Sequence, residues 1–302
     1  MSRHYQAWLL AAHPRSRRQA AWGRRYRIWL QFQSDRAAMV ALAAIAVLIA
    51  VCAGAPLLGL QDPAVQVLTM RVAPPSGDHW LGTDELGRDM LARLVYGGRA
   101  TLGLTTTILL LVAPTGLLIG AFAGFTGGVI DQVLMRVTDV FLAFPRLVLA
   151  LAFVAALKPG IGGAIGATAL TSWPLYARLA RAETLKIRHS DFIAAIRLTG
   201  AGSVRIVLHH IVPLCLPSII VRAALDGGGV MLTIATLGFL GMGVQPPVPE
   251  WGAMIATSRD LILQQWWVPV FPGSLVFLTV LSFTVIGDVL RDALDPKWAG
   301  RC

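Results

Sequence analysis

The chain has 302 residues, of which 56% are hydrophobic and only 14% are charged, and its net charge is +10. Soluble domains carry about 25% charged residues, so this composition excludes an ordinary soluble globular protein and indicates a membrane protein. The positive charge does not predict nucleic-acid binding, because the arginines lie between apolar blocks, as the positive-inside bias of membrane proteins requires.

The first segment in chain order, residues 1–36, is strongly basic. Asp35 is its one acidic residue. Because basic segments beside a membrane span stay on the cytoplasmic side, the amino terminus is expected to be cytoplasmic. Its eight arginines are Arg3, Arg15, Arg17, Arg18, Arg24, Arg25, Arg27 and Arg36.

Apolar windows long enough to cross a bilayer follow this segment. A membrane-spanning helix needs about 20 apolar residues. The windows without Asp, Glu, Lys or Arg are 37–60, 101–130, 159–177, 227–249 and 261–287. The first window has 24 residues, which is longer than the roughly 7 to 15 of a signal peptide, so it predicts an uncleaved anchor.

A sixth candidate span, residues 136–157, contains Arg136, Asp139 and Arg146 and is interrupted by Pro145. Charge supports it nevertheless. The segment 178–205 has six basic residues against two acidic ones, and it falls on the cytoplasmic side only if six spans are counted. The sequence therefore predicts an all-α polytopic membrane protein with six transmembrane helices and both termini in the cytoplasm.

The charged stretch HWLGTDELGRDMLARLVYGGR, residues 79–99, then lies in the outer loop between spans one and two, about 61–100. Glu85 is one helical turn from both Arg88 and Asp89, a spacing that allows charged side chains to interact. Trp80 and Tyr96 suit the membrane interface. The alternative interpretation is a solvated connector.

Two features within the spans indicate helix packing. Gly116, Gly120 and Gly124 lie on one helix face and predict close approach of another helix, either in the same bundle or in a partner. Arg222 and Asp226 are four residues apart and are predicted to pair with each other. A structural ion pair near the cytoplasmic end is favoured over a gate or a proton relay.

Motifs for catalysis or nucleotide binding are missing from the sequence. None of the lysines, Lys158, Lys186 and Lys297, follows a glycine, so the phosphate-binding loop GxxxxGK[ST] is absent. HExxH and GxSxG are absent as well. The three cysteines, Cys52, Cys215 and Cys302, are too scattered for a disulfide framework or a zinc site and are interpreted as packing residues.

The basic segment ARLARAETLKIRHSDFIAAIRLTGAGSVRIVLHHIVPLCLP, residues 177–217, is longer than a simple connector needs to be. Asp191 is predicted to cap a short helix, 192–198, which Gly200 ends. An apolar patch on this helix is expected to dock into a groove of another protein, and the alternative is an amphipathic helix lying on the membrane surface. The patch consists of Phe192, Ala195, Ile196 and Thr199.

This segment resembles the EAA loop of ATP-binding-cassette importer permeases. AAIRLTG, residues 194–200, is similar to the EAA-R-x-x-G block, with Arg197, Gly200 and the later Pro213 in the expected places. The chain departs from the pattern at Ala194, where the family has Glu, and at Ile196, where it has the second Ala.

Two further motifs resemble the C-type permease of dipeptide, oligopeptide and nickel importers. They are HWLGTDELGRDMLARLVYGGRATL at 79–102 and GDVLRDALDPK at 287–297, and the resemblance covers residues 36–298. The signature residues of the outer loop are Trp80, Gly82, Thr83, Asp84, Gly87, Arg88 and Asp89.

The resemblance implies a type I ABC importer permease fold over residues 37–298, in the bacterial inner membrane, with 299–302 as a tail. It implies a homologous B-type permease, two cytoplasmic ATPases and a periplasmic or lipid-anchored substrate-binding protein as partners. ATP and magnesium would be bound by the ATPases, and this chain would bind no cofactor. Coupling would pass through the loop at about 178–210, at Asp191, Phe192, Ala194, Ala195, Arg197 and Gly200.

The resemblance favours peptides as substrate, with nickel or a metal chelate as the alternative. His209 and His210 lack a nearby third ligand and are interpreted as interfacial anchors. A self-contained secondary transporter would show ionisable groups at midplane, and a membrane-embedded enzyme would show a polar catalytic cluster. The spans of this chain favour neither class.

Overall fold

The computed structural model describes residue 8 and residues 16–294, and the regular structure in this part is helical apart from one isolated bridge between Thr83 and Asp89. The long helices are α2 (Arg17–Ser34), α3 (Arg36–Ala53), α4 (Met90–Thr126), α5 (Gly128–Ala143), α6 (Arg146–Leu157), α7 (Ile161–Ile187), α10 (Val212–Phe239) and α12 (Trp267–Leu294). The short ones are η1 (Ala55–Leu57), η2 (Leu68–Met70), α8 (Asp191–Leu198), α9 (Ser203–Ile206), the π-helical η3 (Val207–Ile211), α11 (Trp251–Ser258) and η4 (Arg259–Leu261). Residues 1–7, the tail 299–302 and the last residues of the 287–297 motif lie outside the described residues.

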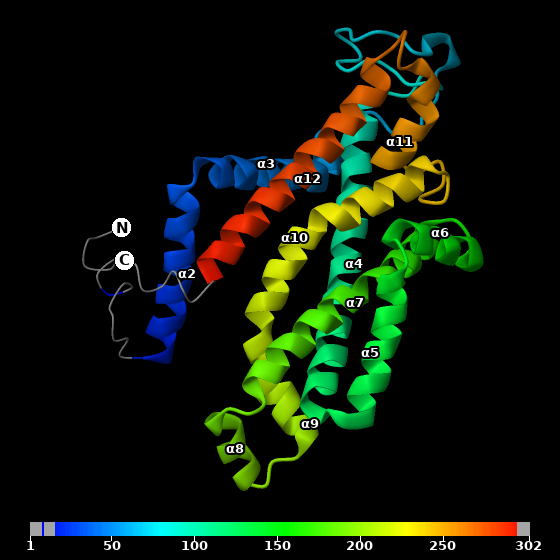
Figure 1. The fold of residues 1–302 in the computed structure, drawn as a ribbon. Helices are drawn as coiled ribbons and strands as arrows, with labels where there is room; N and C mark the ends of the chain where they lie inside the picture. Colours follow the sequence, from blue (N-terminus) through cyan, green and yellow to red (C-terminus); the bar gives the residue numbers. More distant parts are fainter. Residues whose placement is uncertain (1–7, 9–15, 295–302) are drawn as a thin grey trace.

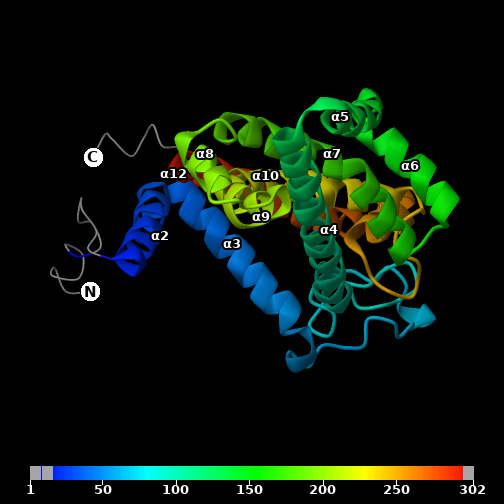
Figure 2. The ribbon, with the colours of Figure 1, turned by 90° about the horizontal axis from the view of Figure 1, so that it is seen from below.

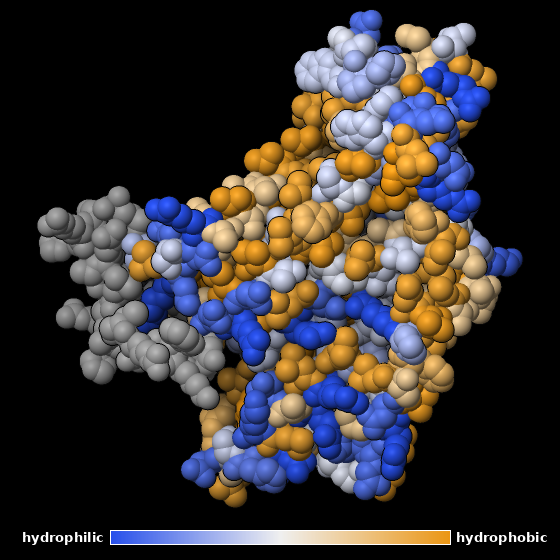
Figure 3. Space-filling view, turned by 45° about the horizontal axis from the view of Figure 1, so that its top comes forward, coloured by the Kyte–Doolittle hydropathy of each residue, from blue (hydrophilic) through white to orange (hydrophobic). Residues whose placement is uncertain are grey.

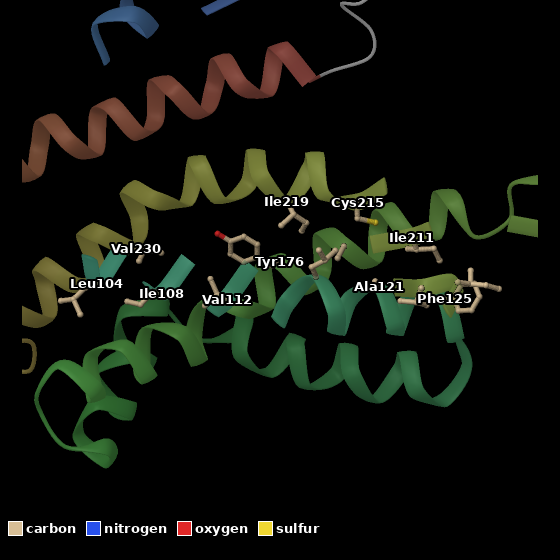
Figure 4. Packing of buried hydrophobic residues seen from close by; sticks show 14 of the residues in the cluster. Leu104, Ile108, Val112, Ala121, Phe125, Tyr176, Ile211, Cys215, Ile219 and Val230 are labelled. Atoms are coloured by element: carbon tan, nitrogen blue, oxygen red, sulfur yellow. The ribbon is translucent and has the colours of Figure 1, made fainter. Parts of the chain in front are cut away.

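The pair α4 and α7 forms the centre of the molecule (Figure 1). A Cβ atom at Gly124 would lie 2.9 Å from Thr184 Cβ, and one at Gly116 or Gly120 would overlap atoms of Tyr176 or Ala177. The predicted glycine face is thus confirmed as a contact between two helices of the same chain. Hydrophobic side chains continue this contact to α10 (Figure 4).

Helix α10 packs against α12 in a similar way. A Cβ atom at Gly227 would lie 2.8 Å from Phe283, and one at Gly287 would lie 2.6 Å from Leu225. Helix α3, which Asp35 caps by accepting hydrogen bonds from two backbone N–H groups, rests against α12 and α4. Seen from below, α2 and α3 lie on one side of the molecule, and α5 and α6 lie on the other (Figure 2).

The predicted span 136–157 is not one straight helix. Helices α5 and α6 are separated by a break at Pro145 and bend by 98° relative to each other. The break has a local cause, because proline lacks the N–H that would continue the helix. Phe141 of α5 stacks on Phe153 of α6 and contacts Trp173 of α7 edge-on, with ring centroids 6.1 Å and 5.6 Å apart.

Four helices are long and apolar enough to span a membrane, and the bent pair α5–α6 is a fifth candidate. This differs from the predicted count of six. The remaining window, 159–177, is helical as part of α7, but its many small and hydroxyl-bearing residues lower its hydropathy. The same residues allow α7 to pack closely on α4.

The two ends of the bundle carry the irregular segments. Residues 54–89 and α11 form one end, and α8 and α9 form the other (Figure 1). A face with much apolar surface lies between hydrophilic groups near both ends (Figure 3). The helix α4 begins at Met90, so the charged stretch 79–99 is half loop and half helix.

Glu250, just before α11, is a buried carboxyl that sequence reasoning did not single out. It caps α11 by accepting hydrogen bonds from the N–H groups of Gly252 and Ala253, and Thr101 of α4 donates a third at 3.2 Å. Burial raises the pKa of Glu250 above its ordinary value, and these three hydrogen bonds oppose the shift. The carboxyl therefore fastens α11 to α4.

Candidate functional site

The short helix α8 protrudes from one end of the bundle (Figure 1). Its predicted extent is confirmed at the C-terminal end, since Gly200 follows with a φ of +79° that favours glycine. The predicted N-cap is wrong by one residue. Ser190 is the cap, accepting from the Ile193 N–H at 3.5 Å, and Asp191 occupies the first turn, where its charge complements the helix dipole.

Three contacts fix α8 to the bundle. Ile193 is fully buried in the hydrophobic core between α4, α7 and α10. The Arg197 guanidinium lies 4.8 Å from the ring centroid of Phe125, at the end of α4. Phe192 meets the ring of His210 edge-on at 5.8 Å. Helix α8 is therefore in direct contact with α4 and with η3, the segment that leads into α10.

The side chains that face away from the bundle make an exposed surface, and Leu198 is its most exposed apolar member, at 90%. Sequence reasoning missed Leu198, and it did not foresee the contacts that Ile193, Phe125 and His210 make with or within α8. Phe125 and His210 belong to other segments than α8, so the sequence of α8 does not predict that they contact it. The six predicted coupling residues are all exposed together here: Asp191, Phe192, Ala194, Ala195, Arg197 and Gly200.

The charged stretch at the opposite end folds inward around Asp84. The Asp84 carboxylate accepts hydrogen bonds from the N–H groups of Leu86 and Arg88 and from Arg88 Nε at 2.6 Å, and it pairs with Arg93 at 3.1 Å. The predicted pairing of Glu85 with Arg88 is confirmed at 2.8 Å.

Asp89 makes a separate set of contacts in the same stretch. It caps α4 through Ala92 N–H and pairs with His79 at 2.9 Å. The Thr83 hydroxyl donates to Met70 C=O and accepts from Ala73 N–H, so the loop is tied to the segment before it. The stretch is therefore an ordered, hydrogen-bonded part of the fold and not a solvated connector.

Most signature residues of this loop are buried. Gly82 and Gly87 have φ values of +76° and +72°, and a Cβ atom at either would collide with backbone atoms of residues 67–74. Trp80, by contrast, is 72% exposed. The signature residues that the structure buries are Gly82, Thr83, Asp84, Gly87, Arg88 and Asp89.

The predicted pair of Arg222 with Asp226 does not form. Asp226 instead accepts hydrogen bonds from Arg146 Nη1 of α6 at 3.0 Å and from the Tyr176 hydroxyl of α7 at 3.2 Å. The reason is tertiary: the break at Pro145 brings the first residue of α6 to α10, and a contact between helices replaces the local one. Asp226 lies well inside the long helical segment 203–239, and Arg146 reaches it from the start of α6.

Comparison with known proteins agrees with this architecture. The family model described as binding-protein-dependent transport system inner membrane component matches residues 116–300. The model of the N-terminal transmembrane domain of oligopeptide transport permease C matches residues 24–75, so the relationship begins earlier than residue 36.

Curated relatives are similar over most of the chain. The probable D,D-dipeptide transport system permease protein of Escherichia coli is 41% identical, covering 82% of this chain and 83% of its own length. The di/tripeptide transport system permease protein of Pseudomonas aeruginosa is 41% identical, covering 89% and 91%. The nickel transport system permease protein of Escherichia coli is 44% identical, covering 78% and 85%.

Among solved structures, a chain of the inward-facing MetNI methionine ABC transporter has the same fold, with a TM-score of 0.57 and 20% identity, over 68% of this chain and 98% of that chain. The chain is all-α with the type I ABC importer permease fold. It belongs to the family of binding-protein-dependent transport system inner membrane components, as a non-catalytic, multi-pass permease subunit of an ABC importer in the inner membrane.

Proposed function

We propose that this chain is the C-type permease half of an importer for di- or oligopeptides. It would work opposite a homologous B-type permease, with two cytoplasmic ATPases and a periplasmic or lipid-anchored binding protein. The observation that supports a peptide substrate is the share of the chain that matches peptide permeases. The dipeptide and di/tripeptide relatives match over 88% and 89% of this chain, against 78% for the nickel relative.

The importer reconstituted with its binding protein should accumulate labelled alanyl-alanine in vesicles when ATP is present, and nickel at equal concentration should not accumulate. Uptake is measured as trapped radioactivity. An ATPase variant that cannot hydrolyse ATP provides the background. Accumulation of nickel without the dipeptide would show that nickel, and not a peptide, is the substrate. Accumulation of neither would contradict both candidate substrates.

The exposed surface of α8 supports the coupling role. Each ATPase would receive one such helix from one permease half, and closure of the ATPases would move the helix. The contacts of Ile193, Arg197 and Phe192 would pass this motion to the spans, which is a rigid-body route to alternating access. This chain itself catalyses no covalent reaction.

We place the α8 end in the cytoplasm and the 54–89 end in the periplasm, because of the basic residues around residues 17–36 and 178–205. Ser34 is an exposed serine at the end of α2, and Ser76 is an exposed serine in the loop 54–89.

In a background with Cys302→Ser, Ser76→Cys should react with a membrane-impermeant maleimide in cells whose outer membrane is permeabilised. Ser34→Cys should react only after the inner membrane is opened. Cys52 and Cys215 are buried, and the background protein controls for them. The opposite labelling pattern would invert the orientation.

A further inference from the structure

Two adjoining cavities lie between α3 and its neighbours in the bundle. The first has a volume of about 250 Å³ and is lined by residues of α3, α4 and α12 and by Leu81 of the loop before α4. The second, of about 220 Å³, lies between α3 and α12. Because Leu48, Val51 and Leu275 line both, the two cavities adjoin. We call the two together the α3 groove.

The α3 groove is long and narrow. Its lining extends from Ala44 to Cys52 on α3 and from Phe271 to Ser282 on α12, which is roughly 12 Å and 16 Å at 1.5 Å per residue. An α-helix with its side chains is about 10 to 12 Å wide, and cavities of these volumes spread over this length do not hold one. Sixteen residues line the groove, whereas a specific protein interface uses about 20 to 30 residues a side. The dimensions therefore favour a single thin chain over a protein partner.

The chemistry of the lining is that of hydrocarbon. No charged side chain is among the sixteen described residues that line the groove. The hydroxyls of Ser274, Thr279 and Ser282 each donate to a backbone C=O of α12 itself, and a free cysteine such as Cys52 behaves as a small apolar residue. A water molecule in a cavity needs two to four polar partners. The groove offers water no such set and suits an apolar ligand.

The groove is accessible from the side of the bundle. Helices α3 and α12 are both candidate membrane spans, and only 17% of the apolar window of α3 is buried. Val47, Val51 and Leu278 line the groove and are themselves exposed. Because these residues lie on spanning helices, the opening faces the hydrocarbon of the bilayer. On α3, the lining residues occupy the half of the helix next to the loop 54–89.

We propose that the α3 groove binds one acyl chain of a membrane phospholipid, in the leaflet on the side of the loop 54–89. The chain would fill both cavities and cover apolar side chains that α3, α4 and α12 leave uncovered. It would thereby hold α3 against α12, because the direct contact of these helices leaves the cavities open. The site does not depend on which substrate the importer carries.

The test uses the assembled importer in nanodiscs that contain phosphatidylethanolamine with a photoactivatable diazirine in one acyl chain. After irradiation, the label is quantified residue by residue by mass spectrometry. Leu48 and Leu275, which line the groove, should carry at least about ten times more label than Ile49 and Phe277, exposed residues of the same two helices outside it. A factor of ten corresponds to the burial of about two methylene groups, which is less than an acyl chain would bury here.

Closing the groove gives the matched comparison. Ala44→Phe together with Ser274→Phe places a ring at each cavity, because both positions are exposed and each lines one cavity. The label on Leu48 should fall about tenfold, by the same reasoning. Ala43→Phe together with Leu281→Phe adds two rings at exposed positions of the same helices outside the groove and should leave the label on Leu48 unchanged.

Equal label on Leu48 and Ile49 would show that lipids merely surround α3, and it would overturn the site. An unchanged label on Leu48 in the variant with the closed groove would overturn it as well. Label on Ile49 and Phe277 with none on the groove residues would mean that another part of the importer covers the groove, which would exclude the lipid. None of these outcomes depends on transport, so a failure of the proposed peptide substrate leaves this site untouched.

Discussion

Replacing Gly120 with leucine should prevent α4 and α7 from packing and should sharply lower the yield of folded protein. A Cβ atom at Gly120 would overlap the carbonyl of Ala177 and lie 2.8 Å from Ala180 Cβ. Neither neighbour has a flexible end that moves aside, so the helices must separate. Overpacking of this kind costs about 1 to 3 kcal/mol or more, and the contacts along the whole glycine face weaken with it.

The measurement is the fraction of detergent-solubilised protein that stays monodisperse on size-exclusion chromatography after heating. Gly103→Leu is the matched control, because Gly103 is on the same helix and a Cβ atom there meets nothing within 4 Å. We expect the control to behave like the unmodified chain. Equal stability of the two leucine variants would show that the α4–α7 contact is not as close as described.

Replacing Leu198 with aspartate should abolish the coupling of ATP hydrolysis to transport while leaving the fold intact. The Leu198 side chain is 90% exposed, so the change disturbs no internal contact. In the assembled importer its apolar surface would be buried in the ATPase groove, where an unpaired carboxylate costs several kcal/mol. Substrate-stimulated ATPase activity should fall to the basal rate, and the ATPase should no longer copurify.

Leu263→Asp is the control for this variant, since Leu263 is 93% exposed and lies between α11 and α12, at the opposite end of the bundle. It should retain both copurification and stimulated activity. Retention of both by Leu198→Asp would exclude this face of α8 as the docking surface, whatever the transported substrate is.

Local features were predictable from the sequence. The spacing of Gly116, Gly120 and Gly124 indicated the close helix contact, and Pro145 indicated the weakness of the sixth span. Gly200 marked the end of α8, because a positive φ favours glycine. Each of these features depends on backbone geometry over a few residues, and the glycines and prolines that determine this geometry can be read from the sequence.

Contacts between distant segments were not predictable. Spacing alone suggested that Arg222 pairs with Asp226, but the actual partner, Arg146, is 80 residues away and reaches Asp226 only because α6 turns by 98° from α5. Likewise, the charges at 79–99 left a solvated connector open as an alternative, and nothing local revealed that Thr83 and Asp84 are buried. Burial is decided by packing, which a single sequence does not specify.

The length of α4 has a mechanical consequence. Its 37 residues extend roughly 55 Å at 1.5 Å per residue, from the Asp89 cap at one mouth of the bundle to Phe125 beneath Arg197 at the other. Pro114 removes one backbone hydrogen bond about two-thirds of the way along the helix. Because α7 packs closely along α4, a tilt imposed on α4 at its α8 end would also displace the segment 54–89 at its other end.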